Sequence, residues 1–289
     1  MKVTTVDMFG DVPGRGSQLD VIIPEGPCDG AVVREIAARA RIAVADESAL
    51  VTWRSRERRA FSSRIFASDG ETSLGTHSVA GVAACLVGRG LLPMGDVERI
   101  APDGRARVRT DGRAVSIRFE GSLIHGTLPH VPRDLGVPSG AGRAGERELL
   151  VGCGVGRSLT LWRVDQDPRS LPPPDAGRMR DLGLTDLTAF RWDEASREVV
   201  ARVFAPGFGI PEDRGCLPAA ASLGAAALRL TSGGAEPLTI RQVTARGTES
   251  VFLCEGSVRD GVARLRITSR VWVATTDTPW GTGTGRSRG

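Results

Sequence analysis

The segment Ser63-Arg64-Ile65-Phe66-Ala67-Ser68 recurs about 140 residues later as Ala201-Arg202-Val203-Phe204-Ala205-Pro206. Each copy is followed by a turn that contains glycine, then by an acidic residue (Glu71 or Glu212), and then by an apolar helix of small residues. Chance similarity between two short strands would not explain the matched helices. The repeat therefore indicates two units of one architecture.

The helices that follow the repeated strands are predicted near His77 to Val87 and near Ala219 to Leu230, and neither stretch has a polar face. A helix that is apolar on all sides belongs inside a protein. The short strands around each helix are enough to curl into a sheet that covers it. The predicted fold class is therefore α+β, with two pseudo-symmetric domains, each a β-barrel-like sheet wrapped around a central buried helix.

The amino-terminal end of each buried helix is a candidate ligand site. The first amides of a helix have no partner within the helix, and its dipole makes that end favourable for an anion. Two such helix starts facing a shared cleft would bind a small carboxylate.

A loop-like segment at 131–147, rich in proline, glycine and small residues, predicts the passage between the two domains. The expected N-terminal domain covers residues 1–130, and the expected C-terminal domain covers residues 131–267. The last strand, near 268–275, is expected to cross back to the N-terminal domain. Residues 276–289 are expected to form a disordered tail.

The composition excludes several classes of protein. Of the 289 residues, 40% are hydrophobic and 25% are charged, and no apolar stretch approaches the roughly 18 residues of a membrane span. The start of the chain lacks the layout of a secretory signal, so a cytoplasmic location is expected. The net charge is +4, but basic residues alternate with acidic ones, which argues against nucleic-acid binding. The five cysteines form no Cys-x-x-Cys pair, so neither a metal site nor a disulfide framework is expected.

Four segments, in order along the chain, carry a further pattern. They are Val6–Pro13, an opening strand and loop; Asp46–Val51, similar to Ser-Glu-Thr-x-Phe-Val; Arg64–Gly81, similar to Arg-x-Phe-Thr-Pro followed by Glu-x-x-x-x-Gly-His-Pro-Thr-x-Gly; and Arg202–Asp213, similar to Arg-x-Phe-Ala-Pro followed by Ile-x-Glu-Asp. In these segments the chain resembles the PhzF-like phenazine-biosynthesis family, whose fold is that of diaminopimelate epimerase. The resemblance implies an active site in the cleft between two barrel domains. It also implies proton transfer on a small carboxylate substrate without metal or cofactor, in a homodimer.

The same resemblance places Glu47 on the family's general acid and base, His77 on its active-site histidine and Asp213 on its second-half acid. A carboxyl that loses water on burial is expected to have a raised pKa, so that it can take and return a proton near neutral pH. A neighbouring histidine and aspartate can hold the substrate and stabilise the charge that develops. Asp46 is the alternative acid if the register is displaced by one residue.

The residues expected to bind substrate lie where the chain departs from the family pattern, in the opening loop and at the two helix starts. They are Ser17, Gln18, Thr76, Ser78, Cys216, Leu217 and Pro218.

The second helix start shows the largest departure. Leu217-Pro218 replaces the family's Gly-Ser, which removes a hydroxyl and, because proline has no amide hydrogen, weakens that anion site. Cys216 stands where diaminopimelate epimerases carry a catalytic cysteine, but the partner position in the first half is Gly75. The pair of thiols used by such epimerases is therefore absent.

The function that these observations favour is that of a cofactor-independent isomerase. It would shift a double bond by proton transfer in a small, cyclic or amino-acid-derived carboxylate of specialised, antibiotic-type biosynthesis. Two alternatives remain open: an epimerase or racemase of an amino-acid-like substrate, and a non-catalytic relative that only binds a metabolite.

Overall fold

The computed structural model describes residues 1–26, 28–41, 43, 45–72, 75–102, 104–122, 135, 147–151, 158–231, 236–276 and 278–279. Most of the expected loop at 131–147 and of the expected tail after residue 276 lies outside the described residues. The strands are β1 (Lys2–Met8), β2 (Ser17–Ile23), β3 (Glu47–Ser55), β4 (Ala60–Ala67), β5 (Gly70–Thr72), β6 (Gly95–Ala101), β7 (Gly104–Thr110), β8 (Ala114–Ser122), β9 (Arg147–Val151), β10 (Ser158–Arg163), β11 (Leu187–Asp193), β12 (Glu198–Ala205), β13 (Ile210–Asp213), β14 (Leu238–Val243), β15 (Glu249–Arg259), β16 (Val262–Val273) and β17 (Thr278–Pro279). The helices are α1 (Gly30–Ala40), α2 (Thr76–Gly88), α3 (Ala176–Asp181) and α4 (Leu217–Leu230), with 3-10 turns η2 (Pro168–Ser170) and η3 (Pro206–Phe208). Within these parts of the chain, no helix is long and apolar enough to cross a membrane.

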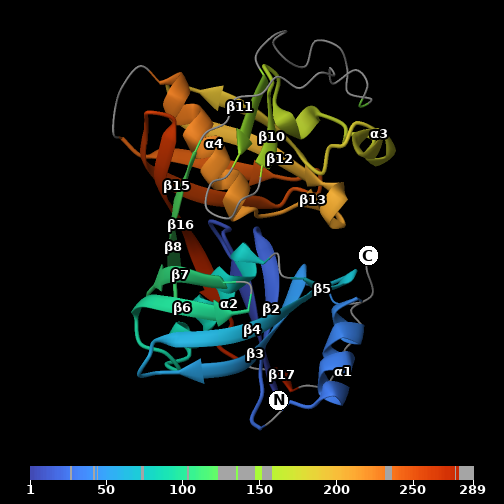
Figure 1. Ribbon diagram of the computed structural model, residues 1–289, viewed down its shortest axis with the longest axis vertical. Coiled ribbons are helices and arrows are strands. Elements are labelled where there is room, and N and C mark those ends of the chain that lie inside the picture. Colours follow the sequence, from blue (N-terminus) through green and yellow to red (C-terminus); the bar gives the residue numbers. More distant parts are fainter. Residues whose placement is uncertain are drawn as a thin grey trace. The chain divides into compact units, whose positions relative to one another are not determined.

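The chain forms two compact units that interleave along the sequence (Figure 1). The first unit comprises Met1–Met8, Ser17–Val115 and Val271–Gly289, and the second comprises Phe9–Gly16 and Ser116–Arg270. Strands β8 and β16 therefore each contribute residues to both units, and the loop after β1 belongs to the second unit. Neither unit is a continuous piece of chain.

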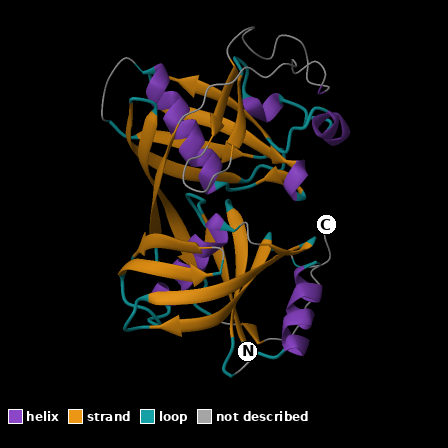
Figure 2. Cartoon of the chain, in the orientation of Figure 1, coloured by secondary structure: helices purple, strands orange, loops and turns teal. Residues whose placement is uncertain are grey.

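The order of strand pairing in the first unit is repeated in the second. In the first unit β2 is parallel to β3, β4 is antiparallel to β3 and β5, and β6 is parallel to β4 and antiparallel to β7. In the second unit β10, β11, β12, β13, β14 and β15 pair in the same way. Each unit thus combines a mixed sheet with a buried helix, α2 or α4, and the first unit also contains α1 (Figure 2). The α+β class and the duplication predicted from the repeat are confirmed.

Helices α2 and α4 are buried within their units, as predicted. Every residue from His77 to Val87 and from Leu217 to Ala227 is buried. Helix α2 packs against β1, β2, β3, β4, β6 and β7, and α4 packs against β10, β11, β12, β14 and β15. Both helices are rich in alanine, which is the best helix former and has a side chain small enough to let strands approach from all sides.

In the first unit the repeated motif joins β4 to β5. Arg64 pairs with Glu71 through Nε–Oε1 and Nη2–Oε2 distances of 2.7 and 2.6 Å. The guanidinium of Arg64 also lies 5.6 Å from the ring centre of Phe66, within range of a cation–π interaction. The spacing of arginine, phenylalanine and acid in the sequence thus corresponds to one small cluster across a hairpin.

The second unit contains the same cluster, but its arginine is buried. Nε of Arg202 lies 2.6 Å from Oε1 of Glu212, and the guanidinium lies 4.8 Å from the ring centre of Phe204. Arg202 also donates a hydrogen bond to the carbonyl oxygen of Leu171. The side chain of Arg202 is 2% exposed, whereas that of Arg64 is 40% exposed. The same ion pair is therefore solvated in one unit and buried in the other.

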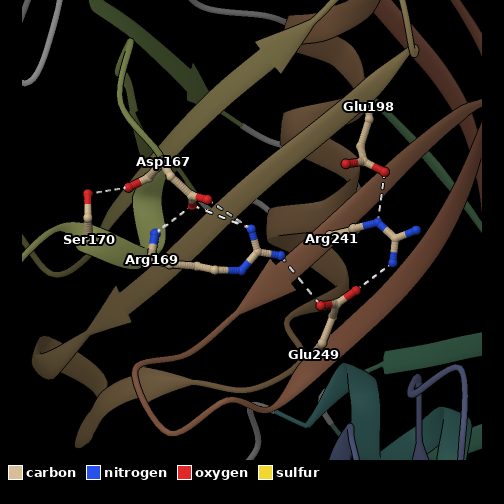
Figure 3. Close-up of polar contacts among 6 residues, drawn as sticks. All are labelled: Asp167, Arg169, Ser170, Glu198, Arg241 and Glu249. Atoms are coloured by element: carbon tan, nitrogen blue, oxygen red, sulfur yellow. Dashed lines mark hydrogen bonds and ion pairs between the residues drawn. The ribbon is translucent and has the colours of Figure 1, made fainter.

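A row of polar contacts connects the η2 turn to the sheet of the second unit (Figure 3). The row consists, in order of contact, of Glu198, Arg241, Glu249, Arg169, Asp167 and Ser170. Arg241 lies 2.7 and 2.5 Å from its two carboxylate partners, and Arg169 lies 3.5 Å from Glu249. Each pair is partly exposed and contributes little alone. Together they hold η2 against the sheet, directly before the Leu171 carbonyl that Arg202 binds.

Gly81 lies in the middle of α2, where the helix touches the sheet. A methyl group at this position would lie 2.5 Å from Sδ of Met8 and 2.6 Å from Cδ2 of Leu19, both of which are fully buried. Alanine favours a helix over glycine by about 1 kcal/mol, but overpacking a core is unfavourable by about 1–3 kcal/mol. We therefore expect Gly81→Ala to lower the free energy of unfolding by about 1 kcal/mol in urea denaturation.

The matched control for this substitution is Gly30→Ala, at the exposed first residue of α1. There the nearest atom to the new methyl group is Nη1 of Arg34, at 3.6 Å, so no overlap opposes the helix preference of alanine. If the Gly81→Ala protein were as stable as the Gly30→Ala protein, the side chains of the sheet around α2 would have to move aside without loss of stability, and the prediction would be wrong.

Candidate active site

Glu47 is the first residue of β3, and its carboxylate contacts the first turn of α2. The side chain is 5% exposed. Nε2 of His77 lies 3.2 Å from Oε2 of Glu47, and the hydroxyl of Ser78 donates a hydrogen bond to the same oxygen. The structure thus brings together two predicted catalytic residues and one residue that the sequence assigned to substrate binding.

The pKa of Glu47 lies below its ordinary value, so the expectation that burial would raise it is wrong. Burial does act to raise the pKa, but the charge of His77 and the hydrogen bonds from His77 and Ser78 outweigh it. Glu47 is therefore a carboxylate at neutral pH. Because its pKa is lowered by folding, ionised Glu47 stabilises the fold above the ordinary carboxyl pKa, and this contribution is lost as the pH falls through the lowered value.

Asp46, the alternative acid, makes different contacts. Its Oδ2 accepts hydrogen bonds from the amide of Gln18 at 3.0 Å and from the hydroxyl of Ser17 at 2.9 Å. The side-chain amide of Gln18 donates to Oδ1 of Asp7 at 2.9 Å. Asp46 thus connects the residue before β3 to the start of β2. Of the two neighbouring acids, Glu47 is the one that contacts α2. A role for Ser17 and Gln18 in substrate binding stays a prediction.

The start of α2 leaves little space around Gly75. A Cβ atom at this position would overlap the end of the Ile65 side chain, so a cysteine there would require that side chain to shift. Thr76, the first residue of the helix, is half-buried, and its role as a substrate-binding residue stays a prediction.

The predicted residues of the second unit lie around the start of α4. Oδ1 of Asp213, at the end of β13, accepts a hydrogen bond from the amide of Gly215 at 2.9 Å. Cys216 precedes the helix, and Leu217 and Pro218 are its first two residues. As expected, the proline leaves this helix start one amide hydrogen short. The catalytic role of Asp213 and the binding roles at this helix start stay predictions.

Gln242 of β14 is a residue that sequence reasoning missed. Its Oε1 accepts a hydrogen bond from the amide of Cys216 at 2.6 Å, and its Nε2 donates to the carbonyl oxygen of Cys216 at 2.8 Å. The glutamine is fully buried and pairs with the peptide of Cys216 as a neighbouring strand would. The sequence around Gln242 does not indicate this role, because its hydrogen bonds to Cys216 join residues that are far apart in the chain.

Asp186 is the counterpart of Glu47 in the second unit. It stands one residue before the strand partner of Phe204, just as Glu47 stands one residue before the strand partner of Phe66. Asp186 is buried, and its Oδ2 accepts a hydrogen bond from the amide of Thr160 at 2.8 Å. Only the pairing register shows this equivalence, since the two acids have different neighbours in the sequence.

The two helix residues that hold Glu47 have no equivalents at the start of α4. His77 and Ser78 are the second and third residues of α2, and the second and third residues of α4 are Pro218 and Ala219. The second unit thus keeps a buried acid but has neither a histidine nor a hydroxyl at the matching helix positions. No group of three or more His, Cys, Asp or Glu side chains among the described residues is arranged to bind a metal ion.

No protein-family model matches the chain, and no curated protein matches it in sequence. Solved structures match it in fold. A phenazine biosynthesis protein of the PhzF family from Enterococcus faecalis has a TM-score of 0.74 at 18% identity, over 96% of this chain and 100% of that one. A PhzF-family phenazine biosynthesis protein from Bacillus anthracis has a TM-score of 0.72 at 15% identity, over 96% and 99%. A hydroxyproline epimerase from Agrobacterium vitis has a TM-score of 0.53 at 14% identity, over 95% and 90%. The chain therefore has the fold of PhzF-family structures, as the four sequence segments predicted.

Proposed function

We propose that the protein is an isomerase that moves one proton within a small carboxylate substrate, with Glu47 as the group that takes and returns the proton. The observation that carries this proposal is the buried carboxylate of Glu47, held by His77 and Ser78 at the start of α2. A buried acid in contact with a histidine and a hydroxyl is a typical arrangement for acid–base catalysis. The fold of PhzF-family structures supports the same class of reaction.

In the proposed reaction Glu47 begins as a base, because its lowered pKa keeps it ionised. It takes a proton from a carbon atom next to a carboxyl or carbonyl group, and the electron pair of the broken C–H bond spreads into that group. The neutral acid so formed returns the proton to a different carbon of the same conjugated system. The double bond shifts by this exchange, and no proton is gained or lost overall. His77 would stabilise the negative charge that develops on the substrate.

A second candidate is an epimerase, in which the proton returns to the same carbon from the opposite face. The similarity in fold to a hydroxyproline epimerase solved with trans-4-OH-L-proline favours this reading. Such a reaction needs a second acid, for which we propose Asp213. A pair of thiols is excluded as the two bases, because Gly75 occupies one of the two positions. The specialised biosynthetic role, the cytoplasmic location and the homodimer implied by the resemblance belong to the proposal as well.

The experiment that tests the proposal is a screen of unsaturated cyclic and amino-acid-derived carboxylates in deuterium oxide, followed by proton NMR. A shifted double bond with deuterium at a new carbon identifies the isomerase. Deuterium at the original carbon with inverted configuration identifies the epimerase. A chelator is present in one arm, and we expect it to leave the rate unchanged because carboxyl chemistry is sufficient.

The screen also contains the outcomes that would contradict the proposal. A carboxylate that binds without change in its bonds or its deuterium content would favour the non-catalytic alternative. Activity that disappears with the chelator and returns with one divalent ion would require a different mechanism.

A further inference from the structure

We infer that Ser78 is a positioning residue for Glu47: its hydroxyl holds Oε2 of the carboxylate beside His77 and leaves Oε1 to exchange the proton with the substrate. The inference rests on the proposed function and deepens it, because it assigns a role to each oxygen of the catalytic carboxylate.

Both groups that contact Glu47 converge on one oxygen. Nε2 of His77 lies 3.2 Å from Oε2, and the hydroxyl of Ser78 donates to the same atom. No described residue donates a hydrogen bond to Oε1 of Glu47. The last torsion of a glutamate side chain is soft, so two donors on Oε2 fix the plane of the carboxylate. The lone pairs of Oε1 are then available to a substrate proton.

The position of Ser78 explains why its hydroxyl is committed to this contact. The residue is fully buried in the first turn of α2, and a buried hydroxyl requires a hydrogen-bond partner. The PhzF-like sequence pattern has proline at the position of Ser78, and the residue at the matching position of α4 is Ala219. Neither proline nor alanine has a side-chain hydrogen-bond donor. The hydroxyl is therefore a feature of the first unit of this chain.

Other charged side chains on the strands beside Glu47 are engaged elsewhere. Asp20 of β2 accepts a hydrogen bond from Thr5 at 2.8 Å, and Arg64 of β4 pairs with its acid on β5. Among the described residues, His77 supplies the charge that acts on Glu47. Removing the hydroxyl of Ser78 therefore removes one hydrogen bond to the Glu47 carboxylate and leaves the charge of His77 in place.

The inference can be tested on the protein alone, without a substrate. The titration of Glu47 is followed by the ¹³C chemical shift of its carboxyl carbon, assigned with Glu47→Gln, in the wild type, Ser78→Ala and Ser78→Thr. Loss of a hydrogen bond to the charged form should move the midpoint in Ser78→Ala up by about one pH unit. Ser78→Thr keeps a hydroxyl and should restore most of the wild-type midpoint. Ser222→Ala, which removes a buried serine from α4, is the matched control and should leave the midpoint unchanged.

A kinetic readout separates positioning from a merely structural role. On a substrate found in the deuterium screen, Ser78→Ala should lower kcat about tenfold and leave KM nearly unchanged, since the proton carrier and not the binding site is disturbed. If the alanine protein is unfolded by circular dichroism, Ser78→Cys, which keeps the volume and has a weak donor, takes its place.

The outcomes distinguish this inference from the proposed function. An unchanged midpoint or an unchanged kcat in Ser78→Ala, together with an inactive Glu47→Gln, would overturn the role of Ser78 and leave the function standing. A fully active Glu47→Gln would overturn both.

Discussion

Replacing Glu47 by glutamine should lower the rate of substrate turnover by about two to four orders of magnitude, the usual contribution of general acid–base catalysis. Glutamine keeps the size of the side chain and can still meet His77 and Ser78, but it cannot take up and return a proton. Substrate affinity should change little, because the role proposed for Glu47 is to transfer a proton and not to hold the carboxylate of the substrate. The measurement is the initial rate and the incorporation of deuterium on the substrate found in the screen.

The matched control is Glu71→Gln, which removes a carboxylate on the surface of the same unit, where it pairs with Arg64. This protein should remain fully active. If Glu47→Gln were equally active, the catalytic assignment would pass to Asp213 or Asp46, which would then be replaced by asparagine in the same assay.

Replacing Arg202 by methionine should lower the free energy of unfolding by about 3 kcal/mol, as expected when one partner of a buried ion pair is removed. The loss would leave the largely buried carboxylate of Glu212 without its cation and the carbonyl of Leu171 without this donor. The equivalent change in the first unit, Arg64→Met, removes a solvated pair and should reduce stability by no more than about 1 kcal/mol. Chemical denaturation of the two proteins measures the difference.

The double variant Arg202→Met with Glu212→Gln tests the reason for the effect. If the uncompensated charge is responsible, neutralising Glu212 should recover part of the lost stability, and the two changes will not be additive. Equal losses from Arg202→Met and Arg64→Met would instead show that burial of the pair has no influence on its contribution.

The parts of the fold that could be predicted from the sequence are those encoded by local pattern. Arginine and phenylalanine two residues apart, with an acid after the next turn, mark the hairpins that carry Arg64 and Arg202. The apolar runs of α2 and α4 predict buried helices because no polar face is available to meet water. Glu47 and His77 could be predicted to belong to one site through the resemblance, and the structure shows the two side chains in contact.

The parts that could not be predicted depend on which distant residues meet. Burial alone predicts a raised pKa for Glu47, and only the positions of His77 and Ser78 reverse the direction. Gln242 and Asp186 are recognised by a hydrogen bond to Cys216 and by a strand register, neither of which leaves a local signal.

The interleaved course of the chain has a consequence for its synthesis. Val6 of β1 pairs with Val273 of β16, so a strand at the very start of the chain is completed by one at its far end. As the chain leaves the ribosome, this edge of β1 cannot form until β16 has been made. Contacts so distant in sequence make folding slow, and although β1 can pair with β2 early, a strand edge that stays open is prone to aggregate. We therefore expect the first unit to close only after β16 has been made, and until then the edge of β1 that pairs with β16 stays open.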